Sequence, residues 1–248
     1  MPTPIERELW ISIPFNRLLA GPANSVLKAV GLPAHDPAHP WANWLTCEIL
    51  VVALIVVLFA YLRSRLSVDK PGKLQHCFEI IYEFLDAQAE EVVGHGSRRF
   101  LAFFGTLFIF ILFLNLLGVI PTLESPTMDA VVPFGFAAAT FVYYNSAGLR
   151  VHGIGGYIKQ FMGPMLLLAP VMLPIELVSH FARPLSLTIR LYANMFAGEQ
   201  VTATFLGLTF IIIPAVFMVL HIFVSILQAY IFALLAMIYV GGAVAQEH

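Results

Sequence analysis

The sequence predicts an all-α, polytopic integral membrane protein whose residues 1–248 form a single membrane domain. Of its 248 residues, 59% are hydrophobic and 11% are charged, whereas soluble domains typically carry about 25% charged residues. Long apolar stretches alternate with short segments rich in proline, glycine and charge, as expected for consecutive membrane spans. The spacings typical of metal or cofactor motifs do not occur. We therefore expect no cofactor, no metal and no nucleic-acid partner.

The first predicted upright span covers residues 41–62 and is apolar apart from Glu48. At about 1.5 Å per residue, a helix of this length crosses a hydrocarbon core about 30 Å thick. Trp41 and Trp44 at its start are typical of an interfacial anchor. Basic residues at its other end predict a cytoplasmic location by the positive-inside rule: Arg63, Arg65, Lys70 and Lys73. Residues 1–20 lack the pattern of a cleavable signal peptide. Because the basic end of this span is expected in the cytoplasm, residues 1–40 are expected to form an outer N-terminal segment.

Residues 74–93 predict an amphipathic helix that lies at the cytoplasmic surface. Apolar residues recur at helical spacing: Leu74, Phe78, Ile81, Leu85 and Val92. Acidic residues follow another face: Glu79, Glu83, Asp86 and Glu90. This acidic face is either solvated or docks a basic partner.

Residues 100–123 and 130–149 predict two further upright spans that form a hairpin. Arg98 and Arg99 precede the first span and Arg150 follows the second, so both of these ends are expected in the cytoplasm. The outer turn between the spans contains strong helix breakers and two acids: Pro121, Glu124, Ser125, Pro126 and Asp129. Glycines after the second span predict a loose link to Lys159: Gly153, Gly155 and Gly156.

The remaining apolar part of the chain is too long for two perpendicular spans, which need about 40–50 residues. Prolines interrupt it: Pro164, Pro170, Pro174, Pro184 and Pro214. We therefore expect two long helices that are bent or strongly tilted, over residues 160–206 and 209–245.

A permanent cation occurs within this apolar part. Only four formal charges lie between Lys159 and Glu247: Glu176, Arg183, Arg190 and Glu199. A charge near the bilayer centre costs about 2.5–3.5 kcal/mol on insertion scales, and arginine does not escape this cost by losing its proton. An intramembrane arginine flanked by two carboxylates therefore predicts a site for charge movement across the membrane.

Helical spacing arranges the polar residues of residues 160–206 on defined faces. Residues seven apart point in the same direction within about 20°. This relation joins Glu176, Arg183 and Arg190, and Ser179 and Ser186 lie beside them. Asn194 falls near the face of Arg190, whereas Glu199 falls on the opposite one.

The next helix carries a second polar stripe, formed by His221, Ser225 and Gln228 at i, i+4 and i+7. Histidine titrates near neutral pH and suits proton transfer. The alternative is that these groups, with Ser179 and Ser186, only make hydrogen bonds between helices. Two other features have no assigned role: His180, and the run Asn145–Gly148, which is weakly similar to an intramembrane serine nucleophile without a base.

The run Arg190–Glu199 closely resembles the signature of subunit a of the rotary proton-translocating ATP synthase. Four other segments match the same family: Pro184–Leu187, Leu227–Phe232, Asn115–Gly118 with Pro121, and Glu247–His248. The resemblance extends over nearly the whole chain from about Trp41.

The resemblance implies a role for each matching residue. Arg190 corresponds to the essential stator arginine, which faces a ring of c subunits. The residues of the outer half-channel are Glu199, His221, Asn194 and Gln228. Those of the inner half-channel are Glu176 and Ser179. The implied partners are the c ring, the b subunits of the peripheral stalk, the remaining ATP synthase subunits and the lipid bilayer. The chain itself is expected to be non-catalytic.

The order of the outer pair, Glu199 before His221, is the bacterial one rather than the mitochondrial one. The resemblance therefore implies a multi-pass protein of the bacterial inner membrane, with the N-terminus outside and the C-terminus in the cytoplasm. Two alternatives are a self-contained ion-coupled transporter, which predicts internal repeats that the sequence lacks, and a structural subunit of a respiratory complex.

Elementary energetics agree with two half-channels that do not meet. A proton that crosses 100 mV releases about 2.3 kcal/mol, and a continuous pore would dissipate this energy. The proton must therefore board a carrier, which we expect to be a carboxylate on another chain.

Overall fold

The structure is a computed structural model that describes residues 9–29, 40–68, 70–94, 96–120, 123–162, 169–208 and 212–245. All secondary structure in these residues is helical, which confirms the all-α fold class. The elements are α1 (Ser12–Ala29), α2 (Asn43–Ser64), α3 (Lys73–Val93), α4 (Arg98–Leu117), the 3₁₀ turn η1 (Pro126–Met128), α5 (Val131–Met162), α6 (Ala169–Leu208) and α7 (Ile212–Val244).

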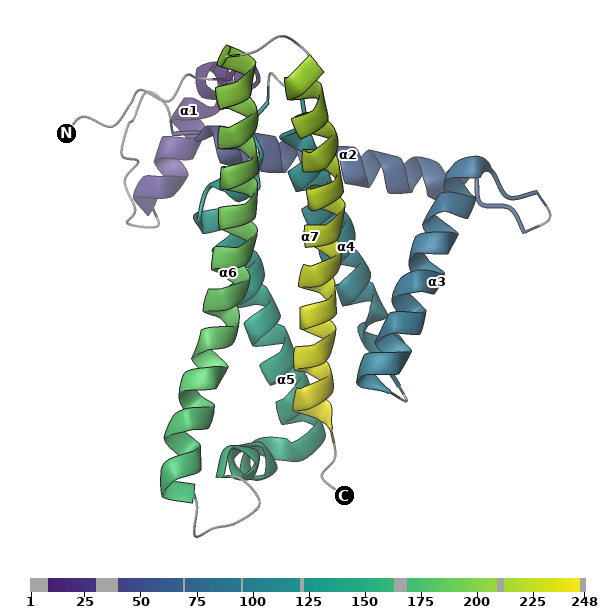
Figure 1. The fold of residues 1–248 in the computed structure, drawn as a ribbon, viewed down its shortest axis with the longest axis vertical. Helices are drawn as coiled ribbons and strands as arrows, with labels where there is room; N and C mark the ends of the chain where they lie inside the picture. The colour runs from purple at the N-terminus through teal and green to yellow at the C-terminus, as the bar shows by residue number, and fades with distance from the viewer. Residues whose placement is uncertain are drawn as a thin grey trace.

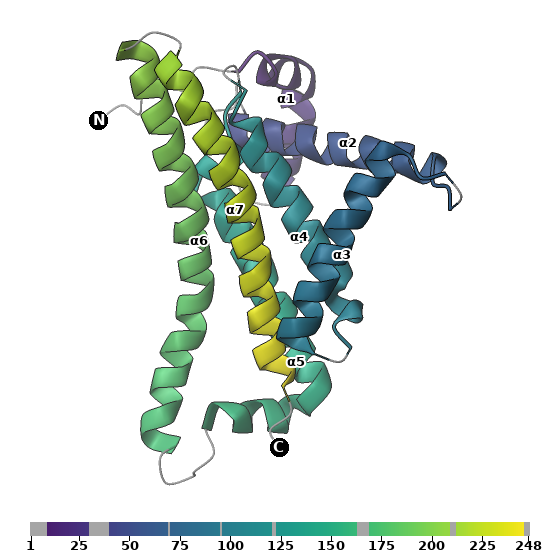
Figure 2. The same ribbon diagram turned by 45° about the vertical axis from the view of Figure 1, so that its right-hand side comes forward.

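The two longest helices, α6 and α7, lie side by side and run in opposite directions (Figures 1 and 2). Helix α5 packs against both of them, and α4 packs against α7. Helix α2 runs across this group rather than along it, and α3 leads back from the end of α2 toward α7 (Figure 1). The C-terminal helices, together with α4 and α5, are therefore inclined to α2. The sequence predicts a tilt only for the C-terminal pair, whereas residues 100–123 and 130–149 were expected to be upright like α2.

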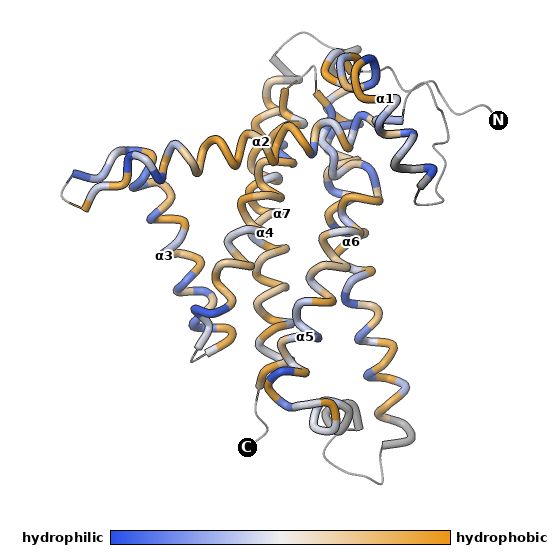
Figure 3. Tube along the Cα trace, turned by 180° about the vertical axis from the view of Figure 1, so that it is seen from behind, coloured by the Kyte–Doolittle hydropathy of each residue, from blue (hydrophilic) through white to orange (hydrophobic). Residues whose placement is uncertain are grey.

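Three helices in the described part of the chain are long and apolar enough to cross a membrane. They are α2, α4 and the segment Ala215–Val244 of α7. The tube coloured by hydropathy shows how uniformly apolar α2 is (Figure 3). The expected span 130–149 lies within α5, and neither α5 nor α6 belongs to this group because polar side chains lower their mean hydropathy.

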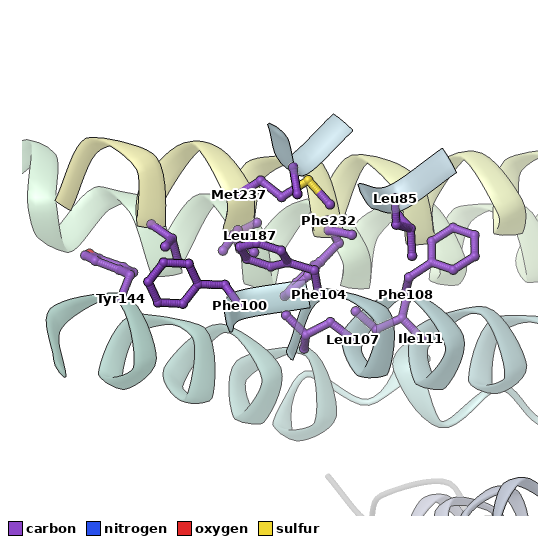
Figure 4. Close-up of a cluster of buried hydrophobic side chains, with 14 of the residues drawn as sticks. Leu85, Phe100, Phe104, Leu107, Phe108, Ile111, Tyr144, Leu187, Phe232 and Met237 are labelled. Atoms are coloured by element: carbon purple, nitrogen blue, oxygen red, sulfur yellow. The ribbon is translucent and has the colours of Figure 1, made fainter. Parts of the chain in front are cut away.

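The main hydrophobic core lies where α4, α5 and α7 meet, and α3 and α6 each add side chains to it (Figure 4). Helix α4 supplies large side chains such as Phe104 and Ile111, which are fully buried. Opposite them, α7 supplies small ones: Ala229, Ala233 and Ala236. Small residues allow helix backbones to approach closely in a membrane. The core therefore fixes α7 firmly, and α7 in turn supports α6.

Helix α3 has the amphipathic character that the sequence predicts. Leu85 and Ala89 are buried against the core, while the acidic residues Glu83 and Glu90 are exposed. The Tyr230 hydroxyl of α7 donates a 3.0 Å hydrogen bond to Gln88 Oε1, which fixes the orientation of α3.

The link expected at Gly153–Gly156 is instead helical. Helix α5 continues to Met162, with one sharp kink at Gly153, where φ is 69° and ψ is 172°. Glycine tolerates this positive φ at no steric cost, so the helix is interrupted at this one residue and a second helical stretch follows in a new direction. Figure 2 shows the second part of α5 turned away from the first. Residues 160–162, expected in the next helix, belong to α5.

In the described residues, the long C-terminal helices span Ala169–Leu208 and Ile212–Val244, so the first extends two residues past its expected end at 206 and the second ends one residue before its expected end at 245. Pro174 and Pro184 lie inside α6 without ending it. Parts of the expected elements lie outside the described residues. They are residues 1–8 and 30–39 of the N-terminal segment, 121–122 of the span 100–123, and 163–168 and 209–211 of the two long helices.

The N-terminal segment contains a helix, α1, that the sequence pattern did not predict. Hydrogen bonds join it to the start of α2. The Ser12 hydroxyl donates to Asn43 Oδ1 at 2.8 Å, and the Trp41 N–H donates to Asn16 Oδ1 at 3.0 Å. The contact between α1 and α2 depends on polar side chains about 25 to 31 positions apart in the sequence. Helical periodicity, which relates only neighbouring turns, does not reveal such a contact.

Candidate functional site

Arg190 lies in the middle of α6 and is half-buried. On one side of it, Leu187 and Leu191 turn into the core, whereas Leu185 and Ile189 on the other side are exposed. Within the described part of the chain, no carboxylate forms an ion pair with Arg190. Its charge is therefore held at the edge of an apolar face without an acidic partner among those residues.

Glu176 and Arg183 form an ion pair on the N-terminal side of Arg190, near the start of α6. The Arg183 Nη2 atom lies 3.7 Å from Glu176 Oε1. The Arg183 guanidinium also lies over the ring of Tyr239 on α7, 5.4 Å from its centroid. Both contacts hold Arg183 between α6 and α7. Ser179, on the same stretch of α6, is exposed.

Asn194 and Gln228 connect α6 with α7 just beyond Arg190. The Asn194 Nδ2 group donates a 2.8 Å hydrogen bond to Gln228 Oε1. Gln228 is only 2% exposed, whereas Asn194 is exposed, so the bond joins a buried side chain of α7 to the accessible surface of α6. The structure thus brings together two residues that the sequence placed 34 positions apart.

Glu199 of α6 and His221 of α7 lie on the same pair of helices, on the side of Arg190 away from Glu176. Glu199 interacts with the backbone of Ser125 and with the charge of Glu124, both in the turn before η1. The residue next to it, Gly198, lies directly against His221: a Cβ atom on Gly198 would come within 3.3 Å of His221 Nδ1. Glycine at this position therefore allows α6 to approach the imidazole.

Four buried polar atoms of this region have no hydrogen-bond partner among the described residues: Glu199 Oε2, His221 Nε2, Ser225 Oγ and Gln228 Nε2. Buried polar groups are normally hydrogen-bonded, and water supplies the bond where protein does not. Most such atoms in the described part of the chain lie on this stretch of α6 and α7, the exception being His152 Nε2. The chemistry of the cluster suits exchange of protons with water.

A cavity of about 260 Å³ with a mixed polar and apolar lining lies beside Glu124. It is lined by Asn43, Trp44, Glu124, Ser125, Met128, Asp129 and Phe196. Because Glu124 and Ser125 also interact with Glu199, the cavity adjoins this part of α6. Glu124 was expected only as part of a turn, since no spacing rule relates it to a residue 75 positions later.

The close contact between Gly198 and His221 leads to a first testable expectation. Replacing Gly198 by Val should reduce proton flux by about 5–140-fold, because overpacking costs about 1–3 kcal/mol and displaces the imidazole. Gly135→Val is the matched control, since a Cβ at Gly135 meets nothing within 4 Å. Proton uptake by membrane vesicles measures the effect. Equal rates for both variants would show that His221 does not depend on this contact.

Comparison with the sequences of known proteins shows the family of this chain. The model of the ATP synthase A chain family matches residues 45–241. ATP synthase subunit a of Solibacter usitatus is 63% identical over 234 residues, which are 94% of this chain and 100% of that protein. Subunit a of Koribacter versatilis is 46% identical over 97% of this chain and 98% of its own length. Subunit a of Bdellovibrio bacteriovorus is 41% identical over 85% of this chain and 94% of its own length. The chain therefore belongs to the ATP synthase subunit a family, a component of the membrane sector of that complex.

Proposed function

We propose that this chain is the stator of a rotary proton motor, with two offset half-channels and Arg190 facing a c-subunit ring. One observation carries the proposal. A single helix, α6, holds Glu176 and Glu199 on either side of Arg190, and each acid has a different partner. Glu176 pairs with Arg183, whereas Glu199 interacts with the turn at Ser125.

The outer half-channel runs from the cavity beside Glu124 to Glu199 and His221. Asn194 and Gln228, which share a hydrogen bond of 2.8 Å, continue the polar path toward Arg190. The buried atoms without protein partners support this path, because each of them can bind the water that carries a proton onward.

The inner half-channel lies at the start of α6 and includes Glu176 and Ser179. Its distance from the outer one follows from helix geometry: Glu176 and Glu199 are 23 positions apart, or about 34 Å at about 1.5 Å per residue. We take α2 to cross the membrane upright, and α6 is strongly inclined to it (Figure 1). The distance between the two acids is therefore mainly a displacement around the ring rather than across the membrane.

Arg190 separates the two half-channels. Exposed apolar side chains surround it on α6, among them Leu185, Ile189 and Phe196, and they form a face against which an apolar ring can turn. The fixed cation repels protons and attracts an ionised carboxylate of the ring. A ring carboxylate therefore loses its proton before it passes Arg190, which couples proton flow to rotation and ATP synthesis.

The proposal assigns the remaining contacts of the chain to its complex. The N-terminus lies outside and the C-terminus in the cytoplasm of a bacterial inner membrane, because basic residues at the end of α2 and the start of α4 favour that side. The c ring, the b subunits of the peripheral stalk and the other ATP synthase subunits are its partners, and nucleotide chemistry takes place in those other subunits.

Co-isolation tests this function against a self-contained ion-coupled transporter. Purified in mild detergent, the chain should retain a ring of small hairpin subunits, and vesicles that contain both should pump protons when the complete complex hydrolyses ATP. A purified chain that transports ions alone in liposomes would contradict the proposal.

A further inference from the structure

A second buried polar cluster lies outside the proposed half-channels, between α5 and α6. It consists of Tyr144, Asn145 and Tyr157 of α5 and His180 of α6, and we call it the His180 cluster. His180 Nε2 lies 3.0 Å from Asn145 Oδ1, and His180 Nδ1 lies 3.4 Å from the Tyr144 hydroxyl. The Tyr157 hydroxyl donates to Asn145 Oδ1 at 2.8 Å. His180, Tyr144 and Tyr157 are at most 8% exposed.

The hydrogen bonds determine the tautomer of His180. The Asn145 Nδ2 group donates to the Phe141 carbonyl at 2.6 Å, so Asn145 Oδ1 is the acceptor that faces the imidazole. His180 Nε2 therefore carries the proton and donates it, and Nδ1 accepts a hydrogen bond from the Tyr144 hydroxyl. The cluster is thus a satisfied network of fixed polarity rather than a proton store.

Two glycines make the cluster possible. The positive φ of Gly153 turns the second part of α5 back, which brings Tyr157 to Asn145. A Cβ at Gly148 would lie 2.5 Å from the Tyr157 ring, closer than real Cβ contacts allow. The kink and the close approach therefore serve the same contact.

The part of α6 that carries His180 needs this support. Pro174 and Pro184 lie on either side of it, and neither supplies a backbone N–H for the helix. In a regular helix, the N–H of residue 184 would bond to the carbonyl of His180. The segment between the prolines is consequently less restrained by its own helix than the rest of α6.

This segment also carries Glu176 and Arg183, one turn from His180 in each direction. The guanidinium of Arg183 interacts with Tyr144 of the cluster as well as with Tyr239 and Glu176. We propose that the His180 cluster clamps this segment to the kinked part of α5 and so positions Arg183 and Glu176. His180 is then a positioning residue of the inner half-channel, an assignment that rests on the proposed function.

Four variants of the assembled complex test the clamp. His180→Leu removes both ring contacts, His180→Gln retains a donor for Asn145, and Tyr157→Phe removes one hydroxyl. Thr140→Val is the matched control, because Thr140 is equally buried on α5 but donates only to Phe136 of its own helix. The readouts are the amount of assembled complex, ATP synthesis, and the rate at which a thiol reagent on the cytoplasmic side labels Ser179→Cys.

We expect His180→Leu to raise the labelling rate and lower ATP synthesis by about three- to tenfold, the range that corresponds to a buried hydrogen bond. His180→Gln should stay within about twofold of the parent. Adding Tyr157→Phe to His180→Leu should have little further effect, because both act through Asn145.

Labelling and synthesis in His180→Leu equal to those of the Thr140→Val control would overturn the clamp, as would a Gln variant as impaired as the Leu variant. Arg190→Ala is measured alongside to keep the two hypotheses apart. If Arg190→Ala stops synthesis while His180→Leu does not, only the clamp fails. If Arg190→Ala leaves synthesis intact, the proposed function itself fails.

Discussion

Replacing Arg190 by Ala is expected to abolish both ATP-driven proton pumping and ATP synthesis while the complex still assembles. The half-buried guanidinium is the attraction that makes a ring carboxylate release its proton. An ion pair at 4 Å is worth about 4 kcal/mol at an effective dielectric constant of about 20, which corresponds to about a thousandfold change in an equilibrium. Acidification of inverted vesicles, driven by ATP, measures the loss.

Arg98→Ala is the matched control for this variant. It removes the same chemical group from an exposed position, where the Arg98 Nε atom lies 3.5 Å from Asp86 Oδ2. Exposed pairs contribute only about 0–1 kcal/mol, so coupled synthesis should remain near the parent level. Normal coupled synthesis in Arg190→Ala would contradict the stator assignment.

Arg190→Lys should restore only part of the activity. A lysine ammonium is a single point charge that loses its proton more readily in an apolar environment, whereas guanidinium stays charged and binds a carboxylate through two donors. The synthesis rate as a function of pH distinguishes the two groups. As the pH is raised, the rate should begin to decline at a lower pH in the Lys variant than in the parent, because the ammonium loses its proton first. Full activity at every pH would show that any cation suffices.

Single replacements of Glu199 by Gln and of His221 by Ala are expected to slow proton flux by about tenfold or more, because each removes a group that exchanges protons by general acid–base transfer. Arg190 remains in place in both variants, so no proton leak should appear. Passive proton flux through membranes stripped of the soluble sector measures the rate.

The double variant tests whether Glu199 and His221 act together. Groups in one transfer path show strong coupling, so the double replacement should be little slower than the worse single one. Additive losses would point to two independent paths. An experimental structure that places the two side chains more than about 10 Å apart, too far for one bridging water, would also rule out the pairing.

Local patterns in the sequence were sufficient to predict most of the helices, although not α1 or the second part of α5. The apolar length of α2, the two faces of α3 and the seven-residue spacing along α6 are properties of adjacent residues, and the structure has each of these helices. The tilt of α6 and α7 was predicted because the apolar segment after Lys159 is longer than two upright spans need.

Contacts between distant residues could not be predicted in the same way. The sequence gives Gly198 no special status, and only the packing of α6 on α7 places it against His221. Likewise, Asn145 and His180 stood without a role because the kink at Gly153 determines their contact. A loose link was the natural interpretation of three glycines, since propensity does not distinguish a kinked helix from a loop.

Labelling of two cysteine variants, Glu176→Cys and Glu199→Cys, tests the separation of the half-channels most directly. Cys77 is exposed and must first be replaced, whereas Cys47 is buried. Membrane-impermeant thiol reagents are then added to one side of the membrane at a time, with Arg190 intact. We expect Glu176→Cys to react only from the cytoplasmic side and Glu199→Cys only from the outer side. Reaction of both cysteines from the same side would show that the two acids share one aqueous path and that Arg190 does not divide it.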